Sequence, residues 1–101
     1  MSGVQGPWDC VMSTPMGDQQ SVLELSVAGD AVTGTSTNDF EKLELSDGKF
    51  DGRTFRWKMV ASFPFKMNLS GEVVVDGDAF SGEVSVGMFG SSAIRGTRRA
   101  S

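Results

Sequence analysis

The alternation of apolar and polar residues along this 101-residue chain is the feature that most limits its fold. Leu23-Glu24-Leu25-Ser26-Val27 and Phe55-Arg56-Trp57-Lys58-Met59 place an apolar side chain at every second position. Successive side chains of a strand point to opposite faces, so this pattern is typical of strands with one buried face. The spacing typical of helices is nearly absent. The sequence therefore predicts an all-β fold, in one domain that spans residues 1–101.

A repeated glycine motif separates the alternating segments. It occurs as Val27-Ala28-Gly29-Asp30-Ala31-Val32, as Phe50-Asp51-Gly52-Arg53-Thr54-Phe55 and as Val75-Asp76-Gly77-Asp78-Ala79-Phe80. A short residue followed by Gly between alternating runs indicates a tight hairpin turn, so we expect turns at 28–29, 51–52 and 76–77. Eight strands fit around these turns: Pro7–Ser13, Gln20–Val27, Asp30–Ser36, Phe40–Phe50, Arg53–Ala61, Lys66–Val75, Asp78–Val86 and Ser92–Arg99.

The number and even spacing of these strands favour an eight-stranded antiparallel up-and-down β-barrel. Closure of the sheet removes two exposed edges that an open sheet would leave unpaired. Within the fourth predicted strand the apolar phase shifts between Leu45 and Phe50, which indicates a β-bulge at Asp47-Gly48. A β-sandwich remains the alternative.

The predicted inner face is almost purely apolar, because nearly every charged residue falls in the opposite phase. A barrel of eight strands is just wide enough to be filled by side chains or to hold one small ligand. Gly34, Gly71, Gly82 and Gly96 fall on the inner face and leave space there, which either a ligand or a ring such as Trp57 could occupy. The candidate ligand-binding residues are Met12, Met16, Leu25, Phe55, Trp57, Met59, Phe65, Met67, Phe80, Val84, Met88, Phe89 and Ile94.

The two ends of the predicted barrel differ. The three tight turns and both termini fall at one end. The other end carries the connections 14–19, 37–39, 62–65 and 87–91, which hold large apolar residues where loops are usually polar. Met16, Phe63, Phe65, Met88 and Phe89 there could form the mouth of a pocket, a plug or a dimer patch.

The composition argues against several kinds of chemistry. The chain has no histidine, which most metal sites and neutral-pH general bases use. Its single cysteine, Cys10, falls on the inner face as a small apolar residue, and Asp76-Gly77-Asp78 fits a turn better than a calcium loop. We therefore predict no catalytic residue, no metal and no cofactor.

Charge and hydropathy also limit the partners and the location. The net charge of −4 disfavours nucleic acid. No apolar run reaches the ~20 residues of a membrane helix, so we predict no membrane span. The absence of a recognisable signal peptide predicts a cytoplasmic protein.

Short motifs at both ends of the chain carry a family resemblance. Gly6-Pro7-Trp8 opens the first predicted strand and Gly96-Thr97-Arg98 closes the last. This resembles the calycins, meaning lipocalins, fatty-acid-binding proteins and avidins. The resemblance implies that Gly6, Trp8 and Arg98 close one end of the barrel, with the basic side chain over the indole ring.

A second resemblance covers nearly the whole chain. With Thr14-Pro15-Met16-Gly17, Asp47-Gly48-Lys49 and Met88-Phe89-Gly90, the sequence resembles a small bacterial lipocalin-like module that occurs alone or appended to amidohydrolases. This resemblance implies the fold more than the function, and it transfers no catalytic residue to this chain.

Three functions fit these observations. The first is a binding module that holds a hydrophobic or amphipathic small molecule in the barrel. The second is a structural or interaction protein that forms a homodimer, or docks on an enzyme, through its apolar loop end. The third is an isomerase or cyclase that acts by enclosing its substrate, which the lack of an inward-facing base disfavours.

Overall fold

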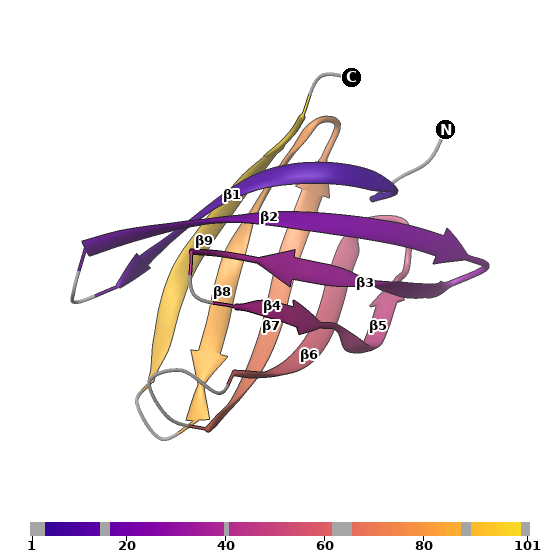
Figure 1. Cartoon of the computed structure of the whole chain (residues 1–101). Coiled ribbons are helices and arrows are strands. Elements are labelled where there is room, and N and C mark those ends of the chain that lie inside the picture. Colours follow the sequence, from indigo (N-terminus) through magenta and orange to yellow (C-terminus); the bar gives the residue numbers. More distant parts are fainter. Residues whose placement is uncertain (1–3, 15–16, 40, 62–65, 88–89, 100–101) are drawn as a thin grey trace.

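Nine antiparallel strands make up the fold in the computed structural model, which describes residues 4–14, 17–39, 41–61, 66–87 and 90–99 (Figure 1). The strands are β1 (Gly6–Thr14), β2 (Gly17–Ala28), β3 (Ala31–Thr37), β4 (Lys42–Glu44), β5 (Ser46–Phe50), β6 (Thr54–Ala61), β7 (Met67–Asp76), β8 (Ala79–Val86) and β9 (Ser91–Arg98). No helix in the described part of the chain is long and apolar enough to cross a membrane.

Pairing between β2 and β3 closes the sheet into a barrel. The strand order is β2-β1-β9-β8-β7-β6-β5-β3-β4, and the additional β2–β3 pairing joins the two sides of this sheet. The ring therefore contains eight strands, with β4 as an extra strand that also pairs with β3. The predicted barrel is confirmed. The β-sandwich alternative is wrong, because a sandwich needs two separate sheets.

The fourth predicted strand, Phe40–Phe50, is divided into β4 and β5. The register of β5 against β6 shifts between Ser46 and Lys49, and Asp47 there has a φ of 52°. One extra residue on β5 produces this shift, as in a β-bulge. The bulge predicted at Asp47-Gly48 is confirmed, while Phe40 lies outside the described residues.

Two of the three predicted tight turns, those at 28–29 and 76–77, are displaced by one residue. Ala28 pairs with Ala31 and Asp76 with Ala79, so the turn residues are Gly29-Asp30 and Gly77-Asp78. Gly29 and Gly77 have φ values of 68° and 63° at the first turn position, where a type II′ hairpin requires glycine.

The turn between β5 and β6 has a different construction. It spans residues 51–53, and Asp51 Oδ1 accepts hydrogen bonds from the backbone N–H groups of Arg53 (3.0 Å) and Thr54 (2.8 Å). The donation from Thr54, followed by that from Arg53, lowers the pKa of the Asp51 carboxyl group.

The β1–β2 hairpin extends beyond the ring of paired strands. Thr14 pairs with Gly17, so the predicted connection over 14–19 is wrong and β2 begins near the tip of the hairpin. The pairing of β3 reaches only as far as Val22 on β2, and the pairing of β9 only as far as Met12 on β1. Figure 1 shows this tip projecting to the left of the other strands.

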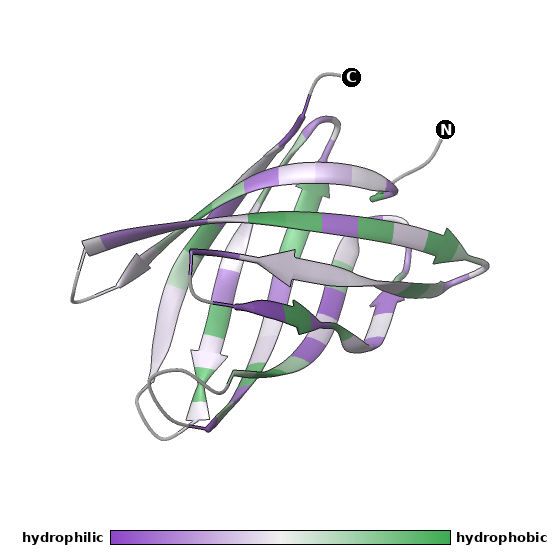
Figure 2. Ribbon diagram, in the orientation of Figure 1, coloured by the Kyte–Doolittle hydropathy of each residue, from purple (hydrophilic) through white to green (hydrophobic). Residues whose placement is uncertain are grey.

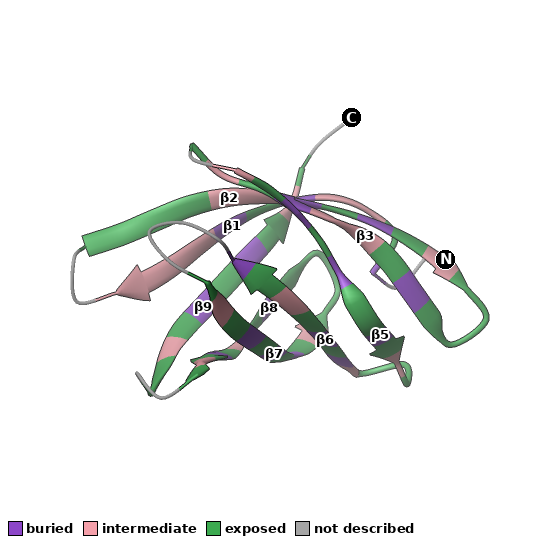
Figure 3. Ribbon diagram, turned by 60° about the horizontal axis from the view of Figure 1, so that its bottom comes forward, coloured by how far each residue is buried: buried purple, intermediate pink, exposed green. Residues whose placement is uncertain are grey.

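Burial follows the alternation closely. Along β6 and β7 buried residues alternate with exposed or partly exposed ones over most of each strand. Figure 2 shows the matching bands of apolar and polar residues, and Figure 3 shows the bands of burial. A single apolar cluster lies inside the barrel, with Trp8, Phe55, Trp57 and Phe80 as its largest members.

Candidate ligand site inside the barrel

One end of the barrel is sealed around Trp8. The indole ring is fully buried, and its Nε1–H donates to the backbone carbonyl of Val4 at 2.9 Å. The guanidinium carbon of Arg98 lies 4.4 Å from the centre of that ring, a cation–π distance. Arg98 also donates to the carbonyl of Gln5 and to Asp78 Oδ1, the latter at 2.9 Å.

These contacts agree with the closing arrangement expected of Gly6, Trp8 and Arg98. Gly6 has a φ of 115°, and a Cβ atom there would lie 3.6 Å from the Arg98 guanidinium. Val4 is a member of the seal that the sequence prediction missed. Its only signal in the sequence is an apolar residue four positions before the tryptophan.

Aromatic rings occupy the space beside two of the inward-facing glycines. A Cβ atom on Gly71 would lie 2.3 Å from Cζ2 of Trp57, and one on Gly96 would lie 2.4 Å from Cζ of Phe80. Trp57 and Phe80 are 2% and 3% exposed. At these two positions the missing side chain makes room for an aromatic ring of the protein itself. Gly71 and Gly96 therefore do not indicate space for a ligand.

The other two inward-facing glycines lie against a neighbouring strand. A Cβ atom on Gly34 would be 2.0 Å from the carbonyl oxygen of Glu24, and one on Gly82 would be 2.1 Å from that of Glu72. Close approach between backbones is a common reason for glycine within a strand. These two positions therefore provide no space for a ligand.

The opposite end of the barrel is lined by methionines. Met12 lies near the end of β1, Met59 near the end of β6 and Met67 at the start of β7, and all three are partly buried against the core. Thioether side chains are flexible and adapt to the shape of a bound molecule. The loop residues expected at the mouth, Met16, Phe65, Met88 and Phe89, lie outside the described residues.

The other candidate ligand residues are inside the barrel. Leu25, Phe55, Phe80, Val84 and Ile94 are all buried. Phe80 contacts the ring of Trp8 at a centroid distance of 4.8 Å, so it belongs to the sealed end. Phe55 stacks on Trp57 at 4.7 Å.

The indole N–H of Trp57 is buried without a hydrogen-bond partner in the described part of the chain. Trp8, the other tryptophan, donates to Val4. Buried donors are nearly always paired, because an unpaired one loses its bonds to water without replacement. Sequence alone gives no sign of which indole would remain unpaired.

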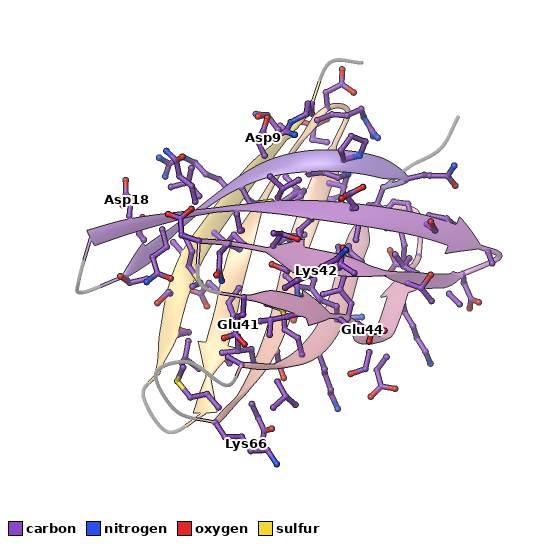
Figure 4. The ribbon with its side chains drawn as sticks, in the orientation of Figure 1. Asp9, Asp18, Glu41, Lys42, Glu44 and Lys66 are labelled. Carbon is purple, nitrogen blue, oxygen red and sulfur yellow. The ribbon has the colours of Figure 1, made fainter. Side chains whose placement is uncertain are left out.

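The charged side chains that the structure describes lie mostly on the outside of the barrel. Figure 4 shows Asp9, Asp18, Lys42, Glu44 and Lys66 on the outside of the ribbon, and each is exposed. Ser36 is the single polar residue in the buried class within the described ranges. Among those residues no group of three potential ligands could hold a metal ion.

Cys10 is the titratable group that does lie inside. Its thiol is buried, and its Sγ lies 3.8 Å from the Trp8 carbonyl oxygen. Burial is the largest cause that raises the pKa of Cys10 to about 12. Since the thiolate is the nucleophilic form, this thiol is unreactive near neutral pH.

Two hollows open on the outer surface of the sheet. The larger, of about 650 Å³, lies over β5 to β8 and is lined by outward-facing residues such as Arg56, Ser70 and Glu83. Arg56 pairs there with Glu72 at 3.2 Å, and both side chains are 61% exposed. The smaller, of about 200 Å³, lies over β1, β8 and β9. Both are open to solvent, and inward-facing residues also border them, including Trp57 and Gly71 at the larger and Phe80 and Gly96 at the smaller.

The comparisons with known proteins support the fold and nothing finer. No protein-family model and no curated protein matched the chain. A solved structure described as a redesigned beta barrel superimposes with a TM-score of 0.71 at 16% identity. The match covers 99% of this chain and 94% of the other. At this identity the similarity establishes the closed barrel.

Proposed function

We propose that this chain is a lipocalin-like binding module that holds a hydrophobic or amphipathic small molecule in the half of its barrel farthest from Trp8. The contrast between the two barrel ends carries this proposal. One end is closed by Trp8 and Arg98, and the other is lined by the partly exposed Met12, Met59 and Met67.

The chemistry of the interior fits such a ligand better than it fits catalysis. The core is apolar, and the thiol of Cys10 is held in its neutral form. Apolar pockets with few polar groups are typical of small-molecule sites. Binding would draw on the apolar area that the ligand removes from water, and on the freedom of the methionine side chains to move.

A probe titration with two variants from neighbouring positions tests the proposal. The neutral fluorophore 1-aminoanthracene should bind saturably, and fatty acids, steroids or small aromatic compounds should compete with it. Met59→Gln places an amide among apolar groups and should weaken binding about tenfold, since an unpaired polar group costs roughly 1–3 kcal/mol. Val60→Gln is the control, because Val60 faces outward and is 47% exposed.

Two results would contradict the proposal. One is the absence of saturable binding for every probe of that panel. The other is an equal effect of the two glutamine substitutions, which would place the probe on the outer surface. Circular dichroism of both variants establishes that each retains the β-sheet spectrum of the natural chain.

A further inference from the structure

The unpaired indole N–H of Trp57 narrows the class of ligand, provided that the proposed binding function holds. The residue is 2% exposed, and its Nε1 atom has no partner among the described residues. A buried donor left unpaired costs free energy relative to a paired one. A ligand that supplies an acceptor at this atom would recover that cost, whereas a pure hydrocarbon would not.

The charges around the barrel disfavour an anionic ligand at this position. A carboxylate inside an apolar chamber needs a cation beside it. Arg98 is the cation nearest to the interior in the described chain, and it lies at the sealed end, over Trp8 and bonded to Asp78. Arg56 and Lys58, the cations that flank Trp57 on β6, are exposed on the outer face.

Trp57 also lies next to the methionine-lined end of the barrel. Met59 follows it on the inner face of β6, two residues nearer to the methionine-lined end, and is only partly buried. A ligand that displaces the flexible Met59 side chain would come next to the indole. The Trp57 ring packs over Gly71 of β7 and stacks on Phe55 of its own strand.

We propose that Trp57 Nε1 donates a hydrogen bond to a neutral oxygen acceptor of the ligand, so that the barrel selects uncharged carbonyl or ether compounds over hydrocarbons and carboxylates. The acceptor oxygen sits at the inner end of the ligand. The apolar remainder extends towards Met12, Met59 and Met67.

Three probes of similar size test this inference: acetophenone, ethylbenzene and benzoate. In ¹⁵N-labelled protein, acetophenone should shift the Trp57 indole proton downfield, and ethylbenzene should bind without that shift. The Trp8 indole, already bonded to Val4, is the internal reference. Benzoate should bind at least about tenfold more weakly than acetophenone, because its charge loses water without gaining a cation.

The variant Trp57→Phe identifies the resonance and removes the donor. It should lower the ratio of acetophenone affinity to ethylbenzene affinity by about three- to tenfold, which is the range of one net hydrogen bond. Taking a ratio cancels the difference in hydrophobicity between the two probes. If the variant does not fold, the comparison of the three probes on the natural chain still decides the question.

The possible results separate the two proposals. If acetophenone and ethylbenzene both bind but the Trp57 indole proton does not move, this inference is overturned while the binding function stands. Tighter binding of benzoate than of acetophenone would overturn the selectivity for neutral ligands. If none of these probes nor those of the earlier panel binds, both proposals fail together.

Discussion

Single residues of the same type have different roles in this barrel. Trp8 and Trp57 are both inside, yet one indole N–H donates to Val4 and the other has no partner among the residues that the structure describes. The glycines divide in the same way, since Gly71 lies under an aromatic ring and Gly34 lies against a neighbouring backbone. Residue type and phase therefore predict burial, but the polar partner of a buried group depends on the folded surroundings.

Alanine at Gly71 should destabilise the barrel. The new Cβ atom would meet the Trp57 ring, which is buried and stacked on Phe55 and so has little room to move. Overpacking of this kind typically costs about 1–3 kcal/mol. Urea unfolding followed by circular dichroism measures the change. Ser70→Ala, at the exposed neighbouring position, is the control, and an equal loss in both variants would contradict the packing argument.

The Cys10 thiol should make stability depend on alkaline pH. Its pKa in the folded chain is about 12, against an ordinary value of 9.0. The unfolded chain therefore loses this proton first. The contribution to stability is complete below pH 9 and is lost progressively as the pH rises from 9 towards 12.

The same thiol should resist alkylation in the folded protein. Iodoacetamide at pH 8 should modify Cys10 only in urea, because the buried thiol is protonated and enclosed. Cys10→Ala should remove the part of the alkaline loss between pH 9 and 12 that this group causes. Rapid alkylation of the native chain, detected by mass spectrometry, would show that the Trp8 end of the barrel opens readily.

Most of the strands could be predicted from the sequence, but some of their ends and turns could not. Alternation located every strand of the ring, and the change of phase after Leu45 located the bulge. Two of the turns were displaced by one residue, because each has a central glycine that could take the first or the second turn position. Only the pairing of Ala28 with Ala31 and of Asp76 with Ala79 decides between these positions. The extension of β2 towards Gly17 was missed, since its exposed polar residues pair through the backbone and leave no alternation.

Two adjacent substitutions in the β5 bulge should change the stability of the fold in opposite directions. Asp47 has a φ of 52°, which favours glycine, so Asp47→Gly should raise the stability by up to about 1 kcal/mol. Its ion pair with Lys58, at 4.0 Å between exposed side chains, contributes little. Gly48→Ala should lower the stability, because the Cβ atom would lie 2.1 Å from the Val32 carbonyl oxygen.

Thermal unfolding of the two bulge variants measures both effects. We expect the midpoint to rise for Asp47→Gly and to fall for Gly48→Ala. A fall for both would mean that the aspartate side chain stabilises the bulge in a way that its backbone conformation does not reveal.

At the scale of the whole molecule, the barrel has one closed end and one end lined with flexible side chains. The overall closure could be predicted, because strand number and spacing leave few alternatives. How the interior is packed could not be predicted, since that depends on which aromatic ring lies over which glycine. The apolar loops expected at the mouth remain a prediction, as their residues lie outside the described part of the chain.

Substitutions of two neighbouring arginines distinguish the contribution that the closed end makes to stability from that of a surface ion pair. Arg98→Ala removes the cation from Trp8 and should destabilise the fold by about 1–2 kcal/mol. Arg99→Ala removes an exposed pair with Asp9 and should change the stability little. Because Arg98 lies opposite the methionine-lined end, its loss should leave the affinity for 1-aminoanthracene unchanged. Chemical unfolding and probe titration on the same samples measure both quantities, and a loss of affinity in folded Arg98→Ala would place the ligand at the closed end instead.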